Sequence, residues 1–262
     1  KKGVEEEEEE GALVDLGAMS VKMPVIIEIE GPRNVNQYFD QIYVLNLDRT
    51  PDRWRKVKSR LDRNGVTKVV RFPAVDGYRK DIRMEWEKYS RGTHNIQIKS
   101  PGAWGHLKSF IAILEHAKQN KYHRILFLED DILFHRNFTS LFRAIELPKE
   151  WKLLYLGAND HGFKNRKITH SCLYKSDKSV FGTFAFGIDH SVFDLLLSVA
   201  KEFNSPSDGA PVVSVMDKYP EQCKVIYPNL IIADVSTSTI RNGANMVQQA
   251  RKVGWTLPMY AY

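Results

Sequence analysis

Short apolar runs alternate along the chain with segments in which apolar residues recur every three or four positions. The short runs are typical of buried strands, and the periodic segments are typical of helices that cover a sheet. Four strands are predicted, over Ile42–Leu47, Val69–Phe72, Ile125–Leu128 and Leu153–Leu156. Three helices are predicted between and after them, over Thr50–Asn64, Ala103–Asn120 and Phe138–Ile145. This alternation predicts an α/β protein with a mostly parallel central sheet flanked by helices.

The second half of the chain has a weaker pattern. The elements predicted there are strands at Ser171–Tyr174 and Phe181–Phe186, a helix over about Ser191–Glu202 and a short helix within Pro206–Tyr219. Ser207 or Asp208 is expected to introduce this last helix, because short polar side chains cap helix starts. The polar stretch 78–100 and the tail 227–262 show no clear period, so no further elements are assigned to them.

Residues 1–20 are interpreted as a segment outside the fold. The run Glu5–Glu10 is unable to pack, and residues 17–20 resemble the scar that remains after a tag is cleaved. A natural acidic leader is the alternative. Residues 21–262 are then predicted to form a single domain.

Composition favours an anionic ligand. The 262 residues are 43% hydrophobic and 11% aromatic, which is enough for a substantial core. The net charge is +6, but the first ten residues carry two Lys and six Glu, a sum of −4, so the other 252 carry +10. Because the basic residues are spread along the chain, nucleotide diphosphates fit this charge better than nucleic acid does.

The two cysteines, Cys172 and Cys223, fit neither a disulfide framework nor a zinc site, and reduced thiols are favoured over a single pair. No apolar stretch reaches the roughly 18 residues of a membrane span, and the start of the chain does not resemble a signal peptide. Asn137 begins a formal glycosylation sequon, although a helix cap is the favoured interpretation. The compartment stays open, with a soluble, cytoplasmic protein favoured over one in the secretory lumen.

The most informative chemistry follows the strand Ile125–Leu128, where Glu129, Asp130 and Asp131 stand in a row. Adjacent carboxylates repel one another and are costly in a low dielectric, so they indicate a compensating cation. Glu129 and Asp131 are expected on one side of an extended chain, where Mg²⁺ or Mn²⁺ would bridge them to a phosphate. A solvated acidic loop is the alternative.

Polar residues also follow the first two strands, over Asn46–Arg53 and Ala74–Gly77. Ligands of open α/β sheets bind at the carboxyl ends of strands. A nucleotide there would meet Arg49 or Arg53 through its phosphates or base and Asp76 through its ribose hydroxyls. A plain turn at Asp76 and a solvated helix face at Arg53 are the alternatives.

Several other site types are excluded or disfavoured. The chain has no Gly-x-Gly-x-x-Gly sequence, no Walker lysine motif and no Gly-x-Ser-x-Gly sequence. His106 and His116 lie ten positions apart, which is no zinc pattern, and each is interpreted as an ordinary surface or packed histidine.

Together these residues resemble glycosyltransferase family 25, which includes bacterial lipooligosaccharide and procollagen galactosyltransferases. The resemblance covers roughly residues 41–238 and rests on four segments in order, which are Ile42–Arg49 with Asp52-Arg53, Ala74–Gly77, Ser100–Gly105 and Leu128–Asp131. Bacterial members usually carry Gly-Cys-x-x-Ser-His in the helix after the third segment. This chain keeps Gly105 and Ser109 but has His106 and Phe110 in place of the Cys and the His.

The resemblance implies a GT-A-type, Rossmann-like glycosyltransferase fold, a UDP-sugar donor and Mn²⁺ or Mg²⁺. It places a nucleotide-binding half at about 38–135 and an acceptor-binding half at about 136–262. The residues implied at the nucleotide are Asn46, Leu47, Arg49, Arg53, Val75, Asp76, Ser109, Glu129 and Asp130. Asp131 would bind the metal directly, with Glu129 and Asp234 as further ligands, while Glu129 or Asp130 would reach the ribose or a bound water.

Transfer with inversion is implied as well, which requires a general base at the acceptor hydroxyl. Asp208 is the candidate, because Ser205–Pro211 resembles the family's Pro-x-Asp segment; Asp217 and Asp189 are weaker candidates, and a helix cap is the alternative role for Asp208. The function hypothesis is transfer of galactose or glucose from a UDP-sugar to a glycan, a lipooligosaccharide or a collagen-like, hydroxylysine-type acceptor. A nucleotidyltransferase acting on a sugar phosphate and a catalytically silent nucleotide-sugar-binding module stay open as alternatives, and the oligomeric state is not predicted.

Overall fold

The computed structural model describes residues 13–15, 20–22, 34–92, 97–237 and 245–261 of the chain. Most of the segment predicted to lie outside the fold, residues 1–20, is outside this description. At its end, β1 (Leu13–Asp15) pairs antiparallel with β2 (Ser20–Lys22).

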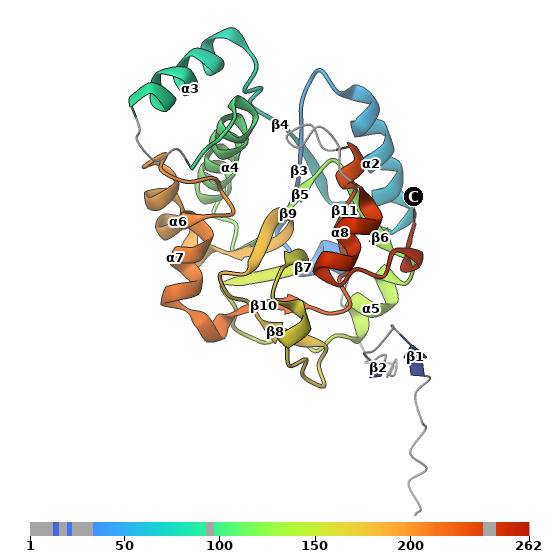
Figure 1. Ribbon diagram of the computed structural model, residues 1–262. Helices are drawn as coiled ribbons and strands as arrows, with labels where there is room; N and C mark the ends of the chain where they lie inside the picture. The colour runs from blue at the N-terminus through green and yellow to red at the C-terminus, as the bar shows by residue number, and fades with distance from the viewer. Residues whose placement is uncertain (1–12, 16–19, 23–33, 93–96, 238–244, 262) are drawn as a thin grey trace, which may run out of the picture.

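A seven-stranded sheet with the order β4-β3-β5-β9-β7-β10-β8 forms the centre of the molecule (Figure 1). Its strands are β3 (Gln41–Asn46), β4 (Val69–Pro73), β5 (Arg124–Glu129), β7 (Leu153–Asp160), β8 (Leu173–Lys175), β9 (Val180–Asp189) and β10 (Cys223–Ile226). From their pairings, β3, β4, β5, β7 and β10 run in one direction, while β8 and β9 run in the other. The prediction of a mostly parallel sheet is confirmed.

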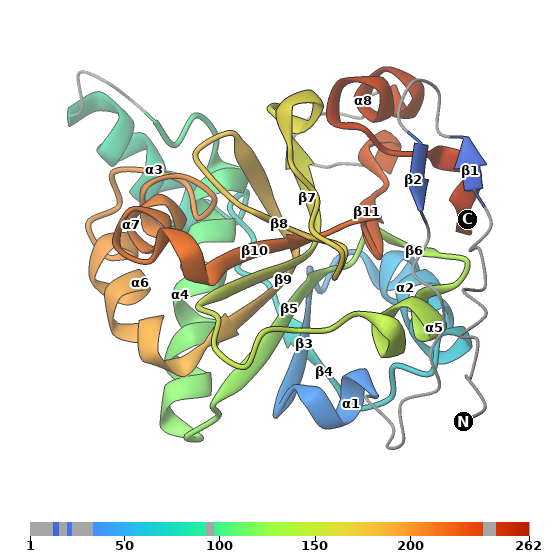
Figure 2. The same ribbon diagram turned by 90° about the horizontal axis from the view of Figure 1, so that it is seen from below.

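Helices cover both faces of this sheet, as Figure 2 shows. One face carries α1 (Val35–Tyr38), α2 (Pro51–Arg63), α5 (Phe138–Ala144) and α8 (Met246–Val253). The other carries α3 (Lys80–Gly92), α4 (Pro101–Gln119), α6 (Phe193–Ala200) and α7 (Ala210–Lys218). Strand β3 is buried throughout because its alternate side chains enter two separate cores, Ile42 and Val44 one, Tyr43 and Leu45 the other.

A second, three-stranded sheet has the order β11-β6-β12 and lies beside the first. Its strands are β6 (Ile132–His135), β11 (Ile231–Ala233) and β12 (Tyr260–Ala261). None of them was predicted, since strands of two to four residues are too short to show a period. Helix α3 was missed for another reason: its surface is polar and Ile82 is its one buried residue.

The predicted helix boundaries are largely confirmed, with one correction at α7. Pro51 stands at the start of α2, and Gly65 follows its end with a φ of 67°. Helix α7 begins at Ala210 with Gly209 as its cap, so the expectation that Ser207 or Asp208 introduces it was wrong. The Asp208 carboxylate instead accepts a hydrogen bond of 3.3 Å from the Gly182 amide of β9.

The remaining general expectations concern thiols and membranes. Cys172 and Cys223 are both buried free thiols, as predicted. No helix in the described part of the chain combines the length and apolar character that crossing a bilayer requires.

His135 gives the fold a pH dependence. The ring is buried, and its Nδ1 accepts a hydrogen bond of 3.1 Å from the Asn137 amide. Burial lowers the pKa of His135 to about 4, whereas an unfolded histidine has a pKa near 6.5. As the pH falls from 6.5 to 4, the unfolded state therefore takes up a proton that the folded state resists, and stability is lost.

We expect a His135→Asn variant to lose about 2 kcal/mol less of its unfolding free energy than the wild type between pH 7 and pH 4. Asparagine keeps an acceptor for the Asn137 amide but has no proton to gain in this range. Urea unfolding of both proteins at several pH values measures the difference. If the unfolding free energies of the two proteins change with pH in the same way, His135 is not the source of this pH dependence.

Candidate functional site

Two adjoining cavities open beyond the carboxyl ends of β3, β4 and β5. The first brings together nine of the residues predicted at the nucleotide or metal, which are Leu47, Arg49, Arg53, Val75, Asp76, Ser109, Glu129, Asp130 and Asp131. The second contains the candidate base Asp208. His106, Glu129 and Asp131 line both cavities and therefore form the boundary between them.

The acidic residues after β5 are held by a cation and by an amide. Asp130 and Asp131 form a turn before β6, so the expectation of an extended chain was wrong. Each is 8% exposed, which excludes a solvated acidic loop. The Arg53 guanidinium lies 2.5 Å from Asp130 Oδ1 and 2.9 Å from Asp131 Oδ2. Asn46 does not line the cavity but donates a hydrogen bond of 2.6 Å to Asp130 Oδ2.

Asp131 is the most perturbed carboxylate of the site. Burial, and next the negative charge of Glu129, raise the pKa of Asp131 to about 7, although Arg53 acts in the opposite direction. Its Oδ1 is buried and has no hydrogen-bond partner among the described residues. Buried, unpartnered carboxylate oxygens are costly, so this atom is suited to a ligand that supplies positive charge.

The loop 74–77 rests directly on α4. Ser109 Oγ accepts a hydrogen bond of 2.8 Å from the Val75 amide and donates one of 2.8 Å to the Gly105 carbonyl. A Cβ on Gly105 would lie 2.4 Å from the Val75 oxygen, and one on Gly77 would lie 1.7 Å from the Pro101 oxygen. Glycine at both positions therefore lets helix and loop make contact through their backbones.

This close contact fixes Asp76 at the wall of the first cavity. Its Oδ2 accepts a hydrogen bond of 2.6 Å from Arg49 Nε, and its Oδ1 accepts one of 3.0 Å from the Tyr78 amide. Burial raises the pKa of Asp76, but these two donors outweigh burial and the pKa is lowered overall. Asp76 is thus an ionised acceptor at the end of β4, with Arg49 beside it.

His106 was missed as a site residue. Its ring lies 3.2 Å from Glu129 Oε1 through Nε2 and 3.0 Å from Ser207 Oγ through Nδ1. Burial lowers the pKa of His106, but the contact with Glu129 outweighs it and the pKa is raised overall. Two signals were available in the sequence: His106 is three positions from Ser109 on one helix, and it follows the glycine of a family motif.

The second cavity lies between the acidic turn and the loop before α7. Besides His106, Glu129 and Asp131, it is lined by Asn159, Thr183, Phe184 and Asp208, among others. Asp234, the predicted third metal ligand, does not line either cavity, although its amide donates to the Asp131 carbonyl at 2.6 Å. The weaker base candidates lie elsewhere, Asp217 paired with Lys178 at 3.1 Å and Asp189 accepting from the Ser191 amide.

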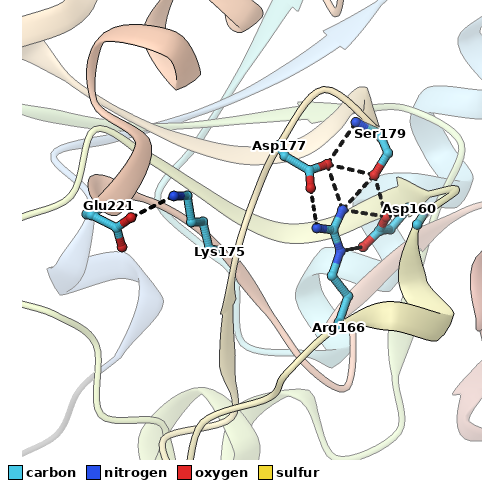
Figure 3. A network of polar contacts seen from close by, with 7 residues as sticks. Asp160, Arg166, Lys175, Asp177, Ser179 and Glu221 are labelled. Atoms are coloured by element: carbon cyan, nitrogen blue, oxygen red, sulfur yellow. Dashed lines mark hydrogen bonds and ion pairs between the residues drawn. The ribbon is translucent and has the colours of Figure 1, made fainter.

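An ion-pair network joins the end of β7 to the segment that precedes β9 (Figure 3). The Arg166 guanidinium contacts Asp160 at the end of β7, at 2.6 Å, and Asp177 before β9, at 2.8 Å. Ser179 accepts a further hydrogen bond of 2.6 Å from the same guanidinium. Asn159, next to Asp160, and Gly182, three positions after Ser179, line the second cavity, so the network lies beside that cavity along the chain.

Asp131 is the residue that best indicates whether the site could hold a metal ion. Across the described ranges, no three His, Cys, Asp or Glu side chains are already arranged to hold a metal ion. The donor set nevertheless suits a hard cation, because Asp131 Oδ1 is a carboxylate oxygen near Glu129 that has no hydrogen-bond partner among the residues described. The residues present therefore fit Mn²⁺ or Mg²⁺ through oxygen ligands.

Comparison with known proteins gives one family. The family model described as glycosyltransferase family 25 (LPS biosynthesis protein) matches residues 39–210. A Drosophila pseudoobscura pseudoobscura protein named glycosyltransferase 25 family member is 27% identical over 158 residues, covering 55% of this chain and 24% of that protein. The human inactive glycosyltransferase 25 family member 3 is 27% identical over 157 residues, covering 56% of this chain and 26% of that protein. The chain thus spans about a quarter of the length of these relatives.

Among solved structures, a glycosyltransferase involved in the glycosylation of the major capsid of PBCV-1 is similar with a TM-score of 0.42 and 11% identity. The similarity covers 82% of this chain and 97% of that one. The family match itself contains every residue of the first cavity and extends through Asp208 of the second.

Proposed function

This chain belongs to glycosyltransferase family 25, and from that premise we propose that it transfers galactose or glucose from a UDP-sugar to an acceptor hydroxyl, with inversion. One observation carries the proposal: two cavities meet at His106, Glu129 and Asp131, and the second contains Asp208. Two substrates can then approach one point from opposite sides. We call the first the donor cavity and the second the acceptor cavity.

In the donor cavity, the nucleotide would lie across the strand ends. Asp76, an ionised acceptor, suits the ribose hydroxyls, and Arg49 beside it suits the base or a phosphate. Arg53 lies at the carboxylates and would contact the diphosphate. This placement follows the rule that open α/β sheets bind ligands outside the carboxyl ends of their strands.

We propose that Asp131 holds Mn²⁺ or Mg²⁺, with Glu129 as a further ligand, whereas Asp234, which lines neither cavity, is left out of the proposed ligand set. When bound, such an ion stabilises the negative charge that develops on the leaving diphosphate. Oδ1 of Asp131 supports this role, because it is buried and has no hydrogen-bond partner in the part of the chain that the structure describes.

In the acceptor cavity, Asp208 would act as the general base. It accepts the proton of the acceptor hydroxyl while the acceptor oxygen forms a bond to the anomeric carbon. The bond from that carbon to the diphosphate oxygen breaks, and UDP leaves with the electron pair. The hydrogen bond from the Gly182 amide orients the carboxylate, and a glycan or a hydroxylysine-type side chain would supply the hydroxyl.

We expect Asp208→Asn to lower the turnover number about 10²- to 10⁴-fold, because general-base catalysis typically contributes that much. The dissociation constant of UDP should stay unchanged, since Asp208 lies outside the donor cavity. Initial rates of UDP release and calorimetric titration with UDP measure the two quantities. Asp217→Asn is the matched control, because Asp217 is paired with Lys178 outside both cavities. Equal losses in both variants would remove Asp208 from the mechanism.

Thermal-shift screening against a panel of nucleotide sugars, each with and without Mn²⁺, tests the function as a whole. A ligand that binds the native state alone raises the melting temperature. A metal-dependent shift with one UDP-hexose, followed by release of UDP in a transfer assay, is the expected result. Release of pyrophosphate would instead indicate a nucleotidyltransferase.

A catalytically silent nucleotide-sugar-binding module is the second candidate. Two observations favour it: the human relative is named inactive, and Arg53 already neutralises part of the carboxylate charge. It predicts a thermal shift with a UDP-sugar but neither hydrolysis nor transfer across a broad panel of acceptors.

A further inference from the structure

One side chain joins the two cavities. His106 extends from the first turns of α4, its side chain is 14% exposed, and it lines both the donor and the acceptor cavity. Nε2 lies 3.2 Å from Glu129 Oε1 at the end of β5. Nδ1 lies 3.0 Å from Ser207 Oγ, in the loop that precedes α7.

Each residue that His106 contacts is adjacent to residues of the proposed site. Glu129 is next to the acidic turn that Arg53 holds. On the other side, Ser207 Oγ also lies 3.3 Å from Thr183 Oγ1, and its neighbour Asp208 accepts a hydrogen bond from the Gly182 amide. The imidazole is therefore the shared contact between a donor-side carboxylate and the loop that carries the candidate base.

The two contacts use different ring nitrogens, which are held apart by a rigid ring. Nδ1 lies at hydrogen-bond distance from Ser207 Oγ and Nε2 at ion-pair distance from Glu129 Oε1, so moving the ring changes both contacts together. A histidine that only filled space would not need both nitrogens to be engaged. A buried ring that lies at ion-pair distance from a carboxylate through one nitrogen and at hydrogen-bond distance from a hydroxyl through the other therefore sets a spacing as well as filling volume.

We propose that His106 is a positioning residue that sets the spacing between the donor and acceptor cavities through two separable contacts. Nε2 holds Glu129 for the donor, and Nδ1 holds Ser207 and, through it, the loop bearing Asp208. The catalytic consequence of this spacing rests on the proposed function. The two contacts themselves do not, and each can be tested without turnover.

Two substitutions separate the contacts. In His106→Gln, the side-chain amide reaches the place of Nε2, so the contact with Glu129 is kept and the contact with Ser207 is lost. In His106→Asn, the shorter amide takes the place of Nδ1, so the contact with Ser207 is kept and the contact with Glu129 is lost. Two readouts follow: the dissociation constant of UDP by calorimetry, and amide hydrogen exchange of the peptide covering residues 203–213.

Each variant is expected to change one readout and leave the other unchanged. His106→Asn should weaken UDP binding about five- to tenfold and leave exchange in 203–213 unchanged, because losing one polar contact, here that of Nε2 with the Glu129 carboxylate, costs about 1 kcal/mol. His106→Gln should leave UDP binding unchanged and accelerate exchange in 203–213 about five- to tenfold. If both variants change both readouts alike, His106 is a packing residue and the inference is overturned.

Variants of His116, on the same helix, and of Ser207, which His106 contacts, serve as controls. His116→Asn and His116→Gln alter a second histidine of α4, which contacts Tyr43 and lines neither cavity, and they should change neither readout. Ser207→Ala should reproduce the exchange result of His106→Gln, and adding it to His106→Gln should have little further effect. Ser207→Ala shows whether the contact at Nδ1 restrains residues 203–213 even if a His106 variant fails to fold.

Failure of this inference differs from failure of the proposed function. If the wild type does not bind UDP, the proposed function is contradicted. The exchange measurement needs no ligand and still decides the inference in that case. If UDP binds but the expected pattern of one changed readout per variant is absent, only the positioning role of His106 is lost.

Discussion

Replacing Asp131 by asparagine is expected to abolish sugar transfer and, at pH 8, to raise the stability of the fold. Transfer should be lost because the variant lacks the carboxylate that is proposed to hold the metal beside the leaving group. The stability should rise because the wild-type carboxylate is buried beside Glu129, and the amide removes that charge. Arg53 keeps a partner in Asp130, so the substitution leaves no new unpaired charge.

The sign of the pH effect follows from the two pKa values. The pKa of Asp131 is about 7 in the folded state and about 4 in the unfolded chain. Ionisation therefore begins to destabilise the wild type above pH 4, and the effect is complete above pH 7. We expect Asp131→Asn to exceed the wild type in unfolding free energy by about 2 kcal/mol at pH 8, with the gain shrinking toward pH 4.

Metal-free protein in urea unfolding experiments at pH 4, 6 and 8 gives the stability difference, and UDP release gives the activity. Asp52→Asn is the matched control, since Asp52 lies beside Arg53 on α2 but is 74% exposed and pairs with Arg55. It should be neutral in both assays. Normal transfer by Asp131→Asn would remove the proposed metal role, and a pH-independent stability change would remove the electrostatic explanation.

A Gly77→Ala substitution should destabilise the fold by about 3 kcal/mol or more and weaken UDP binding at least about a hundredfold. The new Cβ would lie 1.7 Å from the Pro101 carbonyl oxygen, which is backbone and can move only with the start of α4. Loop 74–77 must then separate from the helix, and Asp76 moves with it. Thermal unfolding and calorimetric titration with UDP measure the two effects.

Gly92→Ala is the control for this prediction. Gly92 ends α3, and a Cβ there would meet no heavy atom of the described residues within 4 Å. Alanine is a better helix former than glycine, so the variant should be neutral or up to about 1 kcal/mol more stable. A Gly77→Ala protein with the stability and UDP affinity of Gly92→Ala would show that loop and helix are not in the contact described.

The sequence was sufficient to predict which residues gather at one edge of the sheet, because the signals for this are local. Strand β3 ends at Asn46 and β5 at Glu129, and both ends are marked by an apolar run followed by polar residues. Parallel strands then bring these ends to one edge. The nine predicted residues that share the donor cavity follow from this arrangement.

The contacts within the site could not be predicted, because they depend on which distant segments meet. Ser207 follows His106 by 101 positions, and no local pattern links the two. The Arg166 network likewise joins residues from the ends of separate elements. Asn46 was predicted at the nucleotide, but its side chain donates to Asp130 and does not line the cavity. Its direction could not be predicted either, because the direction of a side chain at the end of a strand depends on the residues that surround it.

The antiparallel strand β9 has a consequence for how the molecule is made. It pairs with β5 on one side and with β7 on the other, so a late segment of the chain lies between the two halves of the sheet. A nascent chain emerging from the ribosome would carry an open edge on β5 until residues 180–189 had been synthesised. Expressed alone, a fragment ending at residue 135 should therefore aggregate through that edge. Co-expressing it with the rest of the chain, which contains β9, should reduce this aggregation because β9 would pair with the open edge of β5.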